Sequence, residues 1–182
     1  MPVKEQTFER FALSDPERRW ELHKGQPREK PAMSVGHNRA LYRLDRELLR
    51  QLNPDRFEVR VNSARARRGD ETYYIPDLMV VPVDDVAALP NRPDVLEVYG
   101  QPLPLVVEIW SPSTGDYDIE GKLPEYQRRG DNEIWRLHPF DRVLTVWRRQ
   151  PDGEYVESVY RGGIVEVASL PGVSIDLDAL FV

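Results

Sequence analysis

The sequence predicts an α/β protein in which a mixed central β-sheet is flanked by helices. Within 73–83 and 103–110, apolar residues occupy successive positions, as in strands that are buried on both faces. A helical period of apolar residues covers 34–52, and a second helical segment, 116–129, lies between strand candidates. This order of elements is typical of helices that cover a mixed sheet.

The length and composition limit the class of protein. The chain has 182 residues and no cysteine, so we expect one domain over 1–182, with 1–17 as an irregular or helical lead-in segment. The absence of cysteine excludes disulfides and thiolate metal ligands and is typical of a reducing compartment. The first twenty residues have no apolar core, and no run approaches the roughly 18 apolar residues of a membrane-spanning helix. We therefore expect a soluble, cytoplasmic protein without a membrane partner.

The first third of the chain begins with a short strand at 20–23, where apolar and polar residues alternate. Residues 24–27 read as the turn of a hairpin because they combine glycine and proline. An amphipathic helix follows over 34–52, with Ser34 as its N-cap.

The middle of the chain carries the strands of the predicted sheet. Residues 57–61 alternate as in a half-buried strand, and the polar segment 62–71 predicts a loop. One strand lies within 73–83. A connection rich in aspartate and proline follows over 84–103, with a helical turn at 85–89.

The last third continues the same pattern. The central strand candidate 103–110 leads into the helix 116–129, which Gly130 ends and Pro124 shifts or kinks. A strand at 133–137 follows. The segments 142–148 and 155–160 form a hairpin whose edge could pair with a second chain, so we predict a homodimer.

Charge is unevenly distributed along a chain whose net charge is −6. Residues 1–70 contain 16 basic and 11 acidic residues, whereas 71–182 contain 9 basic and 20 acidic residues. The basic part includes a cluster that could contact phosphate groups or simply form a solvated hairpin, and both interpretations stay open. The cluster comprises Arg60, Arg65, Arg67 and Arg68.

Glu108 is the most informative single residue, because it interrupts an apolar strand. A carboxylate buried in a strand costs several kcal/mol unless it is paired or bound to a metal. The alternative is a strand that turns Glu108 to solvent, and the apolar neighbours on both sides weaken that alternative.

Asp77 and Lys122 add to the candidate site. Asp77 precedes a buried strand, where it is either a turn or cap residue or the partner of Glu108 on a neighbouring strand. Two such carboxylates suit a hard divalent cation such as Mg²⁺, which activates water for attack on phosphorus. Lys122 follows Asp118 by four residues, so it either orients that water or forms an ordinary helix pair.

These motifs resemble a known family. The segments Ile75–Val81 and Leu105–Thr114, followed by the spaced Asp118 and Lys122, are similar to the putative restriction endonuclease family of the PD-(D/E)XK nuclease superfamily. The resemblance covers about residues 18–150. It implies a restriction-endonuclease-like fold and a DNA endonuclease that hydrolyses phosphodiester bonds with Mg²⁺ or Mn²⁺.

The resemblance also implies roles for individual residues. Asp77 and Glu108 would be the metal ligands, Lys122 would be the catalytic lysine, and Glu21 would be an auxiliary acid. In the usual superfamily pattern a lysine stands two residues after the second acid, but Trp110 stands there in this chain. The helix lysine is this family's variant of the pattern.

Other residues receive weaker interpretations. His37 either faces the site or lies on the helix surface, and the surface interpretation is slightly favoured. Ser113 and Thr114 are expected to cap the helix that follows. His23 and His138 receive no role. The tryptophans Trp110, Trp135 and Trp147 are expected in the core.

Three functions therefore stay open. The first is a metal-dependent DNA endonuclease in which Asp77 and Glu108 bind the ion. The second is a catalytically inactive module of the same fold that binds nucleic acid or protein. The third is a metal-dependent hydrolase of small phosphoesters.

Overall fold

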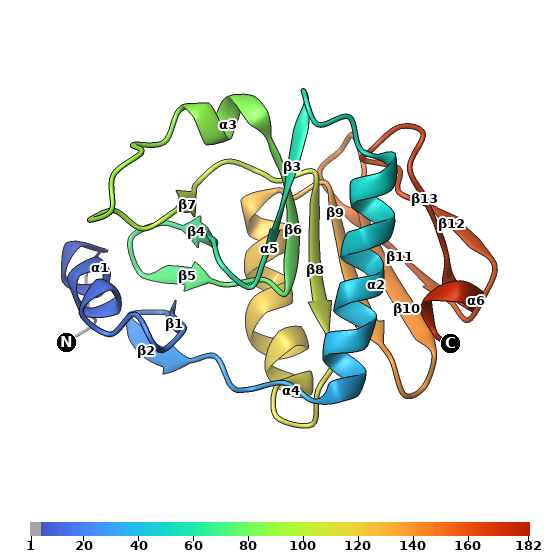
Figure 1. Ribbon diagram of the computed structural model, residues 1–182, viewed down its shortest axis with the longest axis horizontal. Coiled ribbons are helices and arrows are strands. Elements are labelled where there is room, and N and C mark those ends of the chain that lie inside the picture. The colour runs from blue at the N-terminus through green and yellow to red at the C-terminus, as the bar shows by residue number, and fades with distance from the viewer. Residues whose placement is uncertain (1–4) are drawn as a thin grey trace.

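A six-stranded mixed sheet forms the centre of the molecule in the computed structural model, which describes residues 5–182 (Figure 1). The strand order is β11-β10-β9-β8-β6-β3, and β8 pairs with β9 in parallel while the other neighbours pair antiparallel. With helices on both faces, this sheet confirms the predicted fold class. The strands are β3 (Phe57–Val61), β6 (Leu78–Pro82), β8 (Leu105–Ile109), β9 (Glu133–His138), β10 (Val143–Arg149) and β11 (Tyr155–Tyr160).

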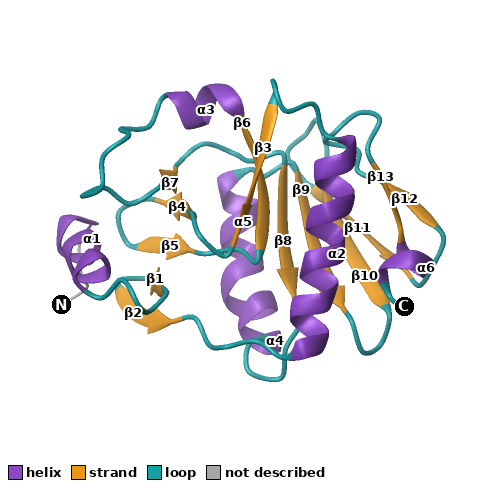
Figure 2. Ribbon diagram, in the orientation of Figure 1, coloured by secondary structure: helices purple, strands orange, loops and turns teal. Residues whose placement is uncertain are grey.

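Two helices lie on opposite faces of this sheet (Figure 2). α2 (Val35–Gln51) covers the face that Leu78 and Val80 share, and α5 (Leu123–Arg129) covers the face of Met79. The strand side chains alternate between the two faces, so β6 and β8 are apolar at successive positions. Both predicted runs are thus buried on both sides.

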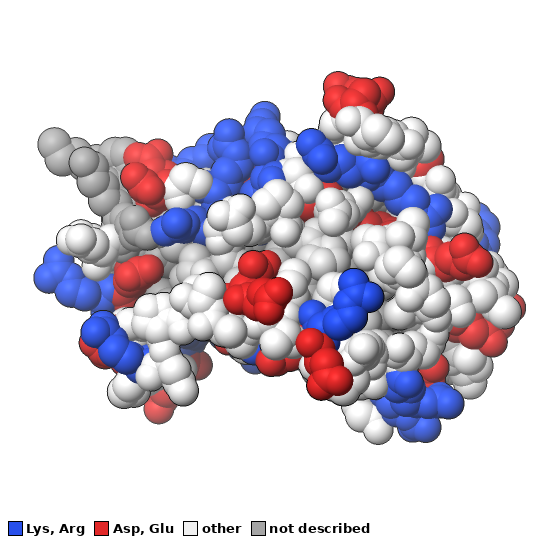
Figure 3. Space-filling model, turned by 90° about the horizontal axis from the view of Figure 1, so that it is seen from above, with Lys and Arg blue, Asp and Glu red and all other residues white. Residues whose placement is uncertain are grey.

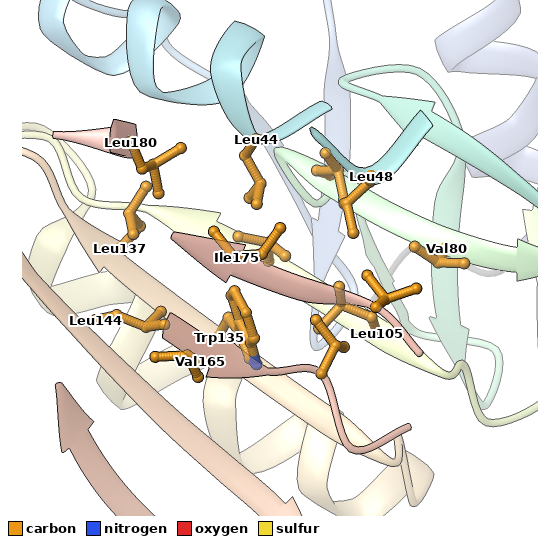
Figure 4. Close-up of a cluster of buried hydrophobic side chains, with 14 of the residues drawn as sticks. Leu44, Leu48, Val80, Leu105, Trp135, Leu137, Leu144, Val165, Ile175 and Leu180 are labelled. Carbon is orange, nitrogen blue, oxygen red and sulfur yellow. The ribbon is translucent and has the colours of Figure 1, made fainter. Parts of the chain in front are cut away.

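α2 begins and ends where its sequence signals predict. Ser34 is the N-cap, and its side chain accepts a hydrogen bond from the backbone N–H of His37. The buried side of α2 contacts the sheet together with the C-terminal elements β12 (Ile164–Glu166), β13 (Ser174–Asp176) and α6 (Leu177–Leu180), as Figure 4 shows. This cluster fixes α2, and hence its first turn, against the ends of β6 and β8.

A smaller sheet, in the order β2-β1-β5-β4-β7, lies beside the central one. The predicted lead-in contains α1 (Glu5–Ser14), which packs on this sheet through Phe8, whose ring centroid lies 5.2 Å from that of Tyr73. Residues 1–4 lie outside the described part. The strands are β1 (Trp20–His23), β2 (Gln26–Glu29), β4 (Arg65–Arg68), β5 (Thr72–Tyr74) and β7 (Val98–Tyr99).

Several predicted boundaries in this region are wrong. The segment 62–71 is not a loop, since β4 pairs with β5 and buries Ala66. The single strand predicted within 73–83 is two strands, β5 and β6, which belong to different sheets. The chain changes sheets at 75–77, and this change places Asp77 at the start of β6.

Two further boundaries differ from the prediction. The turn predicted at 24–27 is shorter, because Gln26 and Pro27 already belong to β2. A proline is tolerated there since β2 is an edge strand of its sheet. The helical turn predicted at 85–89 is α3 (Val83–Ala87), which begins two residues earlier.

The helix predicted over 116–129 is interrupted. It consists of α4 (Gly115–Tyr117), a π-helical turn η1 (Asp118–Lys122) and α5, and Gly130 ends it in a left-handed conformation (φ 82°). Pro124 has no N–H to donate to the preceding turn. The Leu123 N–H instead bonds to the Asp118 carbonyl, five residues back. The wider turn carries two residues of the candidate site, Asp118 and Lys122.

β11 is an edge of the central sheet. Two of its apolar side chains, Val156 and Val159, are each 53% exposed. The homodimer predicted for this hairpin stays a prediction, which light scattering would test.

Candidate active site at the ends of β6 and β8

Asp77 and Glu108 face each other across neighbouring strands. β6 and β8 are antiparallel with Leu78 opposite Val107, and continuing this register by one residue sets Asp77 opposite Glu108. Directly opposed residues of an antiparallel pair have Cβ atoms about 5 Å apart. The two side chains are 1% and 4% exposed. The juxtaposition that the sequence left open is therefore present in the fold.

Asp77 is surrounded by hydrogen-bond donors. Its Oδ2 accepts a hydrogen bond from the backbone N–H of Ile109 at 2.7 Å and lies 3.0 Å from Nε2 of His37. Its Oδ1 lies 2.8 Å from the ammonium of Lys30. Burial alone raises the pKa of Asp77, but Lys30 and His37 outweigh burial and hold that pKa well below its usual range. Asp77 is therefore ionised and fixed in place.

Glu108 has a different environment. Its Oε1 accepts hydrogen bonds from the phenol of Tyr126 at 2.6 Å and from the ammonium of Lys122 at 3.1 Å. Burial raises the pKa of Glu108 to about 8, since the attraction of Lys122 is opposed by the nearby charges of Asp118 and Asp77. The two opposed carboxyl groups thus differ in their affinity for a proton.

Lys122 lies between three carboxylates. Its Nζ is 3.0 Å from Oε1 of Glu21, 3.1 Å from Glu108 and 3.7 Å from Asp118. Burial lowers the pKa of Lys122, but these acids raise it well above its usual value. The helix-pair interpretation is incomplete, because the side chain reaches two strands as well as the helix residue Asp118.

Glu21 and Asp118 come to the site from different elements, β1 and η1. Glu21 is on β1 and also accepts the backbone N–H of Ile75 at 2.8 Å, which ties the smaller sheet to the site. Asp118 accepts a hydrogen bond from the hydroxyl of Thr114 at 3.0 Å, while its Oδ1 is buried and has no hydrogen-bond partner among residues 5–182. Burial also raises the pKa of Asp118.

Acids outnumber bases in this cluster. Four carboxylates face two ammonium groups and one imidazole, all with side chains that are 5% exposed or less. With all four acids ionised, the cluster has an excess of two negative charges when the imidazole is neutral and of one when it is charged; protonation of Glu108, whose pKa is raised to about 8, lowers each excess by one. Such an excess is costly in a protein interior. The members of this cluster, called the acidic cluster below, are Glu21, Asp77, Glu108, Asp118, Lys30, Lys122 and His37.

The favoured surface interpretation of His37 is wrong. The side chain is fully buried and contacts Asp77, because α2 presents its first turn to the start of β6. Lys30, which the sequence analysis did not single out, also reaches Asp77. Neither contact has a local sequence signal, since the partners are 40 or more residues apart.

The residues that follow β8 differ in part from expectation. Trp135 and Trp147 are buried as predicted, but Trp110 is half-buried, with its ring stacked on His138 at 4.1 Å between centroids. Thr114 occupies the N-cap position of α4, but its side chain makes no capping bond there. Its hydroxyl bonds to the acidic cluster instead.

The basic cluster around β4 is largely neutralised by neighbouring groups. Arg60 pairs with Glu97 at 2.6 Å, and Arg68 pairs with Glu125 at 2.9 Å. Arg65 is buried and donates to the Trp20 carbonyl at 3.2 Å. These partners favour a structural role for the cluster over a phosphate-binding one.

The acidic cluster could hold a hard divalent cation through a small number of carboxylate ligands, with water completing the coordination. Within residues 5–182, no three His, Cys, Asp or Glu side chains converge as a ligand group. Both recorded contacts to Glu108 use Oε1, and Oδ1 of Asp118 has no hydrogen-bond partner. Two carboxylates with several waters are a common arrangement for Mg²⁺. The negative excess is the charge that such an ion would neutralise.

Comparison with known proteins identifies the family of this chain. A family model described as Uma2, putative restriction endonuclease, matches residues 5–178. The chain belongs to this family. It is also similar to a crystal structure described as a putative nuclease belonging to DUF820 from Anabaena variabilis ATCC 29413. That similarity has a TM-score of 0.79 at 18% identity and covers 99% of this chain and 98% of the other.

The Uma2 match confirms the predicted resemblance and supports a nuclease. At 18% identity, the structural similarity shows a shared fold and leaves the site residues untested. No curated protein shows significant similarity to the chain. Among the described residues of this family member, no helix is long and apolar enough to cross a membrane.

Proposed function

We propose that this Uma2-family protein is a DNA endonuclease that hydrolyses phosphodiester bonds with a divalent cation, Mg²⁺ or Mn²⁺. The observation that carries the proposal is the opposed, buried pair of Asp77 and Glu108 inside a cluster in which acids outnumber ammonium groups. Asp77 and Glu108 would hold the ion. When bound, the ion would lower the pKa of water and stabilise charge on a phosphoryl oxygen.

The protein's own residues would act around that ion. Lys122 keeps its proton between Glu21 and Glu108, so its ammonium can orient a water molecule or neutralise charge on the phosphate. Glu21 would act as the auxiliary acid by fixing Lys122 and the Ile75 backbone. Tyr126 holds Oε1 of Glu108 and so orients the other oxygen of that carboxylate.

A row of arginines on α2 supports a nucleic-acid substrate. Its members recur at intervals of four, three and four residues, so they share the side of α2 that faces away from its buried leucines. α2 runs along the sheet (Figure 1), and His37 lies in its first turn. Arg39 and Arg46 are exposed and make no hydrogen bond or ion pair within residues 5–182. The row consists of Arg39, Arg43, Arg46 and Arg50.

The face seen from above carries both signs of charge. Figure 3 shows Lys and Arg interspersed with Asp and Glu there, with one larger basic group near the back edge. In the α2 row, Arg43 donates to the Leu180 carbonyl and Arg50 pairs with Glu47, so Arg39 and Arg46 are the candidates for contact with phosphates. Replacing Arg39 and Arg46 with glutamine should weaken DNA binding and make its salt dependence shallower by about 1.8 in log–log slope.

The catalytic assignment is tested by DNA cleavage with Mg²⁺ or Mn²⁺. We expect Asp77→Asn and Glu108→Gln to abolish cleavage while circular dichroism shows a folded protein. Asp55→Asn is the matched control, since Asp55 is an exposed acid beyond the end of α2. Cleavage by both site variants at the wild-type rate would refute the assignment.

One observation favours the alternative of a catalytically inactive binding module. Both oxygens of Asp77 already face donors, namely Ile109, His37 and Lys30. Calorimetry with Mn²⁺ separates the two functions, because an inactive module of this kind would bind DNA without binding the ion.

A further inference from the structure

The ammonium group of Lys30 lies beside Asp77 and supplies a positive charge next to its carboxylate. Lys30 follows β2 directly, and its Nζ lies 2.8 Å from Oδ1 of Asp77 and donates to the Ile75 carbonyl at 2.6 Å. The side chain is 2% exposed. A lysine is rarely buried to this degree without a paired acid. Asp77 is the acid that pairs with it here.

The two oxygens of Asp77 are used differently. Oδ2 accepts the backbone N–H of Ile109 and lies against His37, so a fixed part of the fold holds it. Within residues 5–182, Oδ1 has no hydrogen bond of normal geometry, and the ammonium of Lys30 is its ion-pair partner. Oδ1 is thus the oxygen that a metal ion would take, and the ammonium blocks it.

An ammonium and a divalent ion compete for such an oxygen. Mg²⁺ binds oxygen at about 2.0–2.1 Å, and a second cation at hydrogen-bond distance from the same oxygen repels it strongly. Lys30 belongs to a segment outside the sheets and helices, so its displacement would not disrupt a strand or a helix. Residues 30–34 lie between β2 and α2 without helix or strand structure, and the Lys30 backbone is bonded through N–H to the Arg19 carbonyl at 2.7 Å.

We propose that Lys30 is an internal counter-ion that holds the metal-free site together and must leave Asp77 when a divalent ion binds. Lys30 is then a positioning residue whose displacement couples metal binding to movement of the 30–34 segment. The inference rests on the proposed function, because it assigns the ion to Asp77. The cost of displacing Lys30 lowers the apparent affinity for the ion.

Lys122 provides a matched control within the acidic cluster. It is equally buried and carries the same charge, but its contacts are to Glu21, Glu108 and Asp118. Removing Lys122 therefore makes the cluster more negative without exposing an Asp77 oxygen. Removing Lys30 makes the cluster more negative and also exposes Oδ1 of Asp77. Because Lys122 bonds to Oε1 of Glu108, the second proposed ligand, the two variants compare release of Asp77 Oδ1 with release of Glu108 Oε1 at an equal change of charge.

The test measures Mn²⁺ binding by calorimetry for wild type, Lys30→Met and Lys122→Met. We expect Lys30→Met to bind Mn²⁺ at least about tenfold more tightly than wild type, which is about 1.4 kcal/mol, and more tightly than Lys122→Met. Equal or weaker binding by Lys30→Met overturns the inference, as does the absence of Mn²⁺ binding in all three proteins.

A second measurement avoids the risk that Lys30→Met fails to fold. In wild type, saturating Mg²⁺ should speed hydrogen exchange at the Lys30 amide, while amides in the centre of α2 keep their protection. Unchanged or slower exchange at Lys30 overturns the inference. A different result would refute the proposed function, namely DNA cleavage by Asp77→Asn and Glu108→Gln at the wild-type rate.

Discussion

Two buried groups of charges in this protein are built in different ways. At one end of the central sheet, Arg129 and Asp131 pair at 3.0 Å with side chains that are 1% and 0% exposed. Arg129 also donates to the carbonyls of Tyr99 and Gln101, and Asp131 accepts the backbone N–H of Leu103. The charges of this balanced pair are equal and opposite. The acidic cluster at the ends of β6 and β8 is also hydrogen-bonded, but its four acids outnumber its two ammonium groups.

The difference separates a structural ion pair from a candidate site. Both groups carry the cost of desolvation, but only the balanced pair offsets it within the protein. In the acidic cluster, the excess charge and the unbonded Oδ1 of Asp118 leave favourable interactions unmade. Natural proteins tolerate such a deficit mainly at functional sites. The contrast thus supports a ligand for the acidic cluster without reference to any relative.

The largest expected change in stability comes from a substitution that breaks the balanced pair of Arg129 and Asp131. Arg129→Met should lower the free energy of unfolding by about 3–5 kcal/mol, because it leaves Asp131 buried without its partner. Urea denaturation measures this change. The double variant Arg129→Met with Asp131→Leu should recover much of the loss. If the single variant were as stable as wild type, the pair would not be the structural element that its contacts indicate.

The second effect is specific to the acidic cluster. Mg²⁺ or Mn²⁺ at one hundred times its dissociation constant should stabilise wild type by about 2.7 kcal/mol. Glu108→Gln should lose this increment, because it removes one of the two proposed ligands. Arg129→Met should keep it on a lower baseline. Thermal denaturation with and without the ion gives both values, and an equal increment in Glu108→Gln would contradict the assignment.

The sequence predicted the parts of this fold that local physics determines. The leucines of α2, the cap at Ser34 and the apolar runs of β6 and β8 each follow from spacing or composition. β4 was missed because its residues are mostly arginine, and a polar segment reads as a loop unless its long-range partners are known. The sequence predicted that Pro124 shifts or kinks the helix over 116–129, but it did not predict the π-helical turn, because a proline permits either a kink or a wider turn.

The residues of the candidate site likewise fall into those that the sequence predicted and those that it did not. Glu108 was singled out because its own neighbours are apolar. Local spacing left Asp77 and Lys122 open, and the family resemblance implied their roles and added Glu21. Lys30 and His37 could not be predicted, since their importance arises from contact with a residue 40 or more positions away. Contacts of that kind depend on how the chain passes between the two sheets.

A smaller effect sharpens the contrast within the acidic cluster itself. Asp118→Asn removes one excess charge and keeps an oxygen that can accept the hydroxyl of Thr114. We expect the free energy of unfolding to rise by about 1 kcal/mol, as is common when a functional site is relieved of strain. Chemical denaturation at neutral pH measures it. A loss of stability would mean that Asp118 is required to balance Lys122.

The smallest effect concerns pH and the balanced pair. Tyr155 donates its hydroxyl to the Asp131 carbonyl at 2.5 Å, and burial raises the pKa of Tyr155 to about 12. A folded-state pKa above the unfolded value of about 10 stabilises the protein below pH 10, and this contribution is lost as pH rises from 10 to 12. Tyr155→Phe lacks that contribution, so its stability should fall less steeply over this window. Urea denaturation between pH 9 and 12 compares the two slopes, and identical slopes would show that the phenol is solvated in the folded protein.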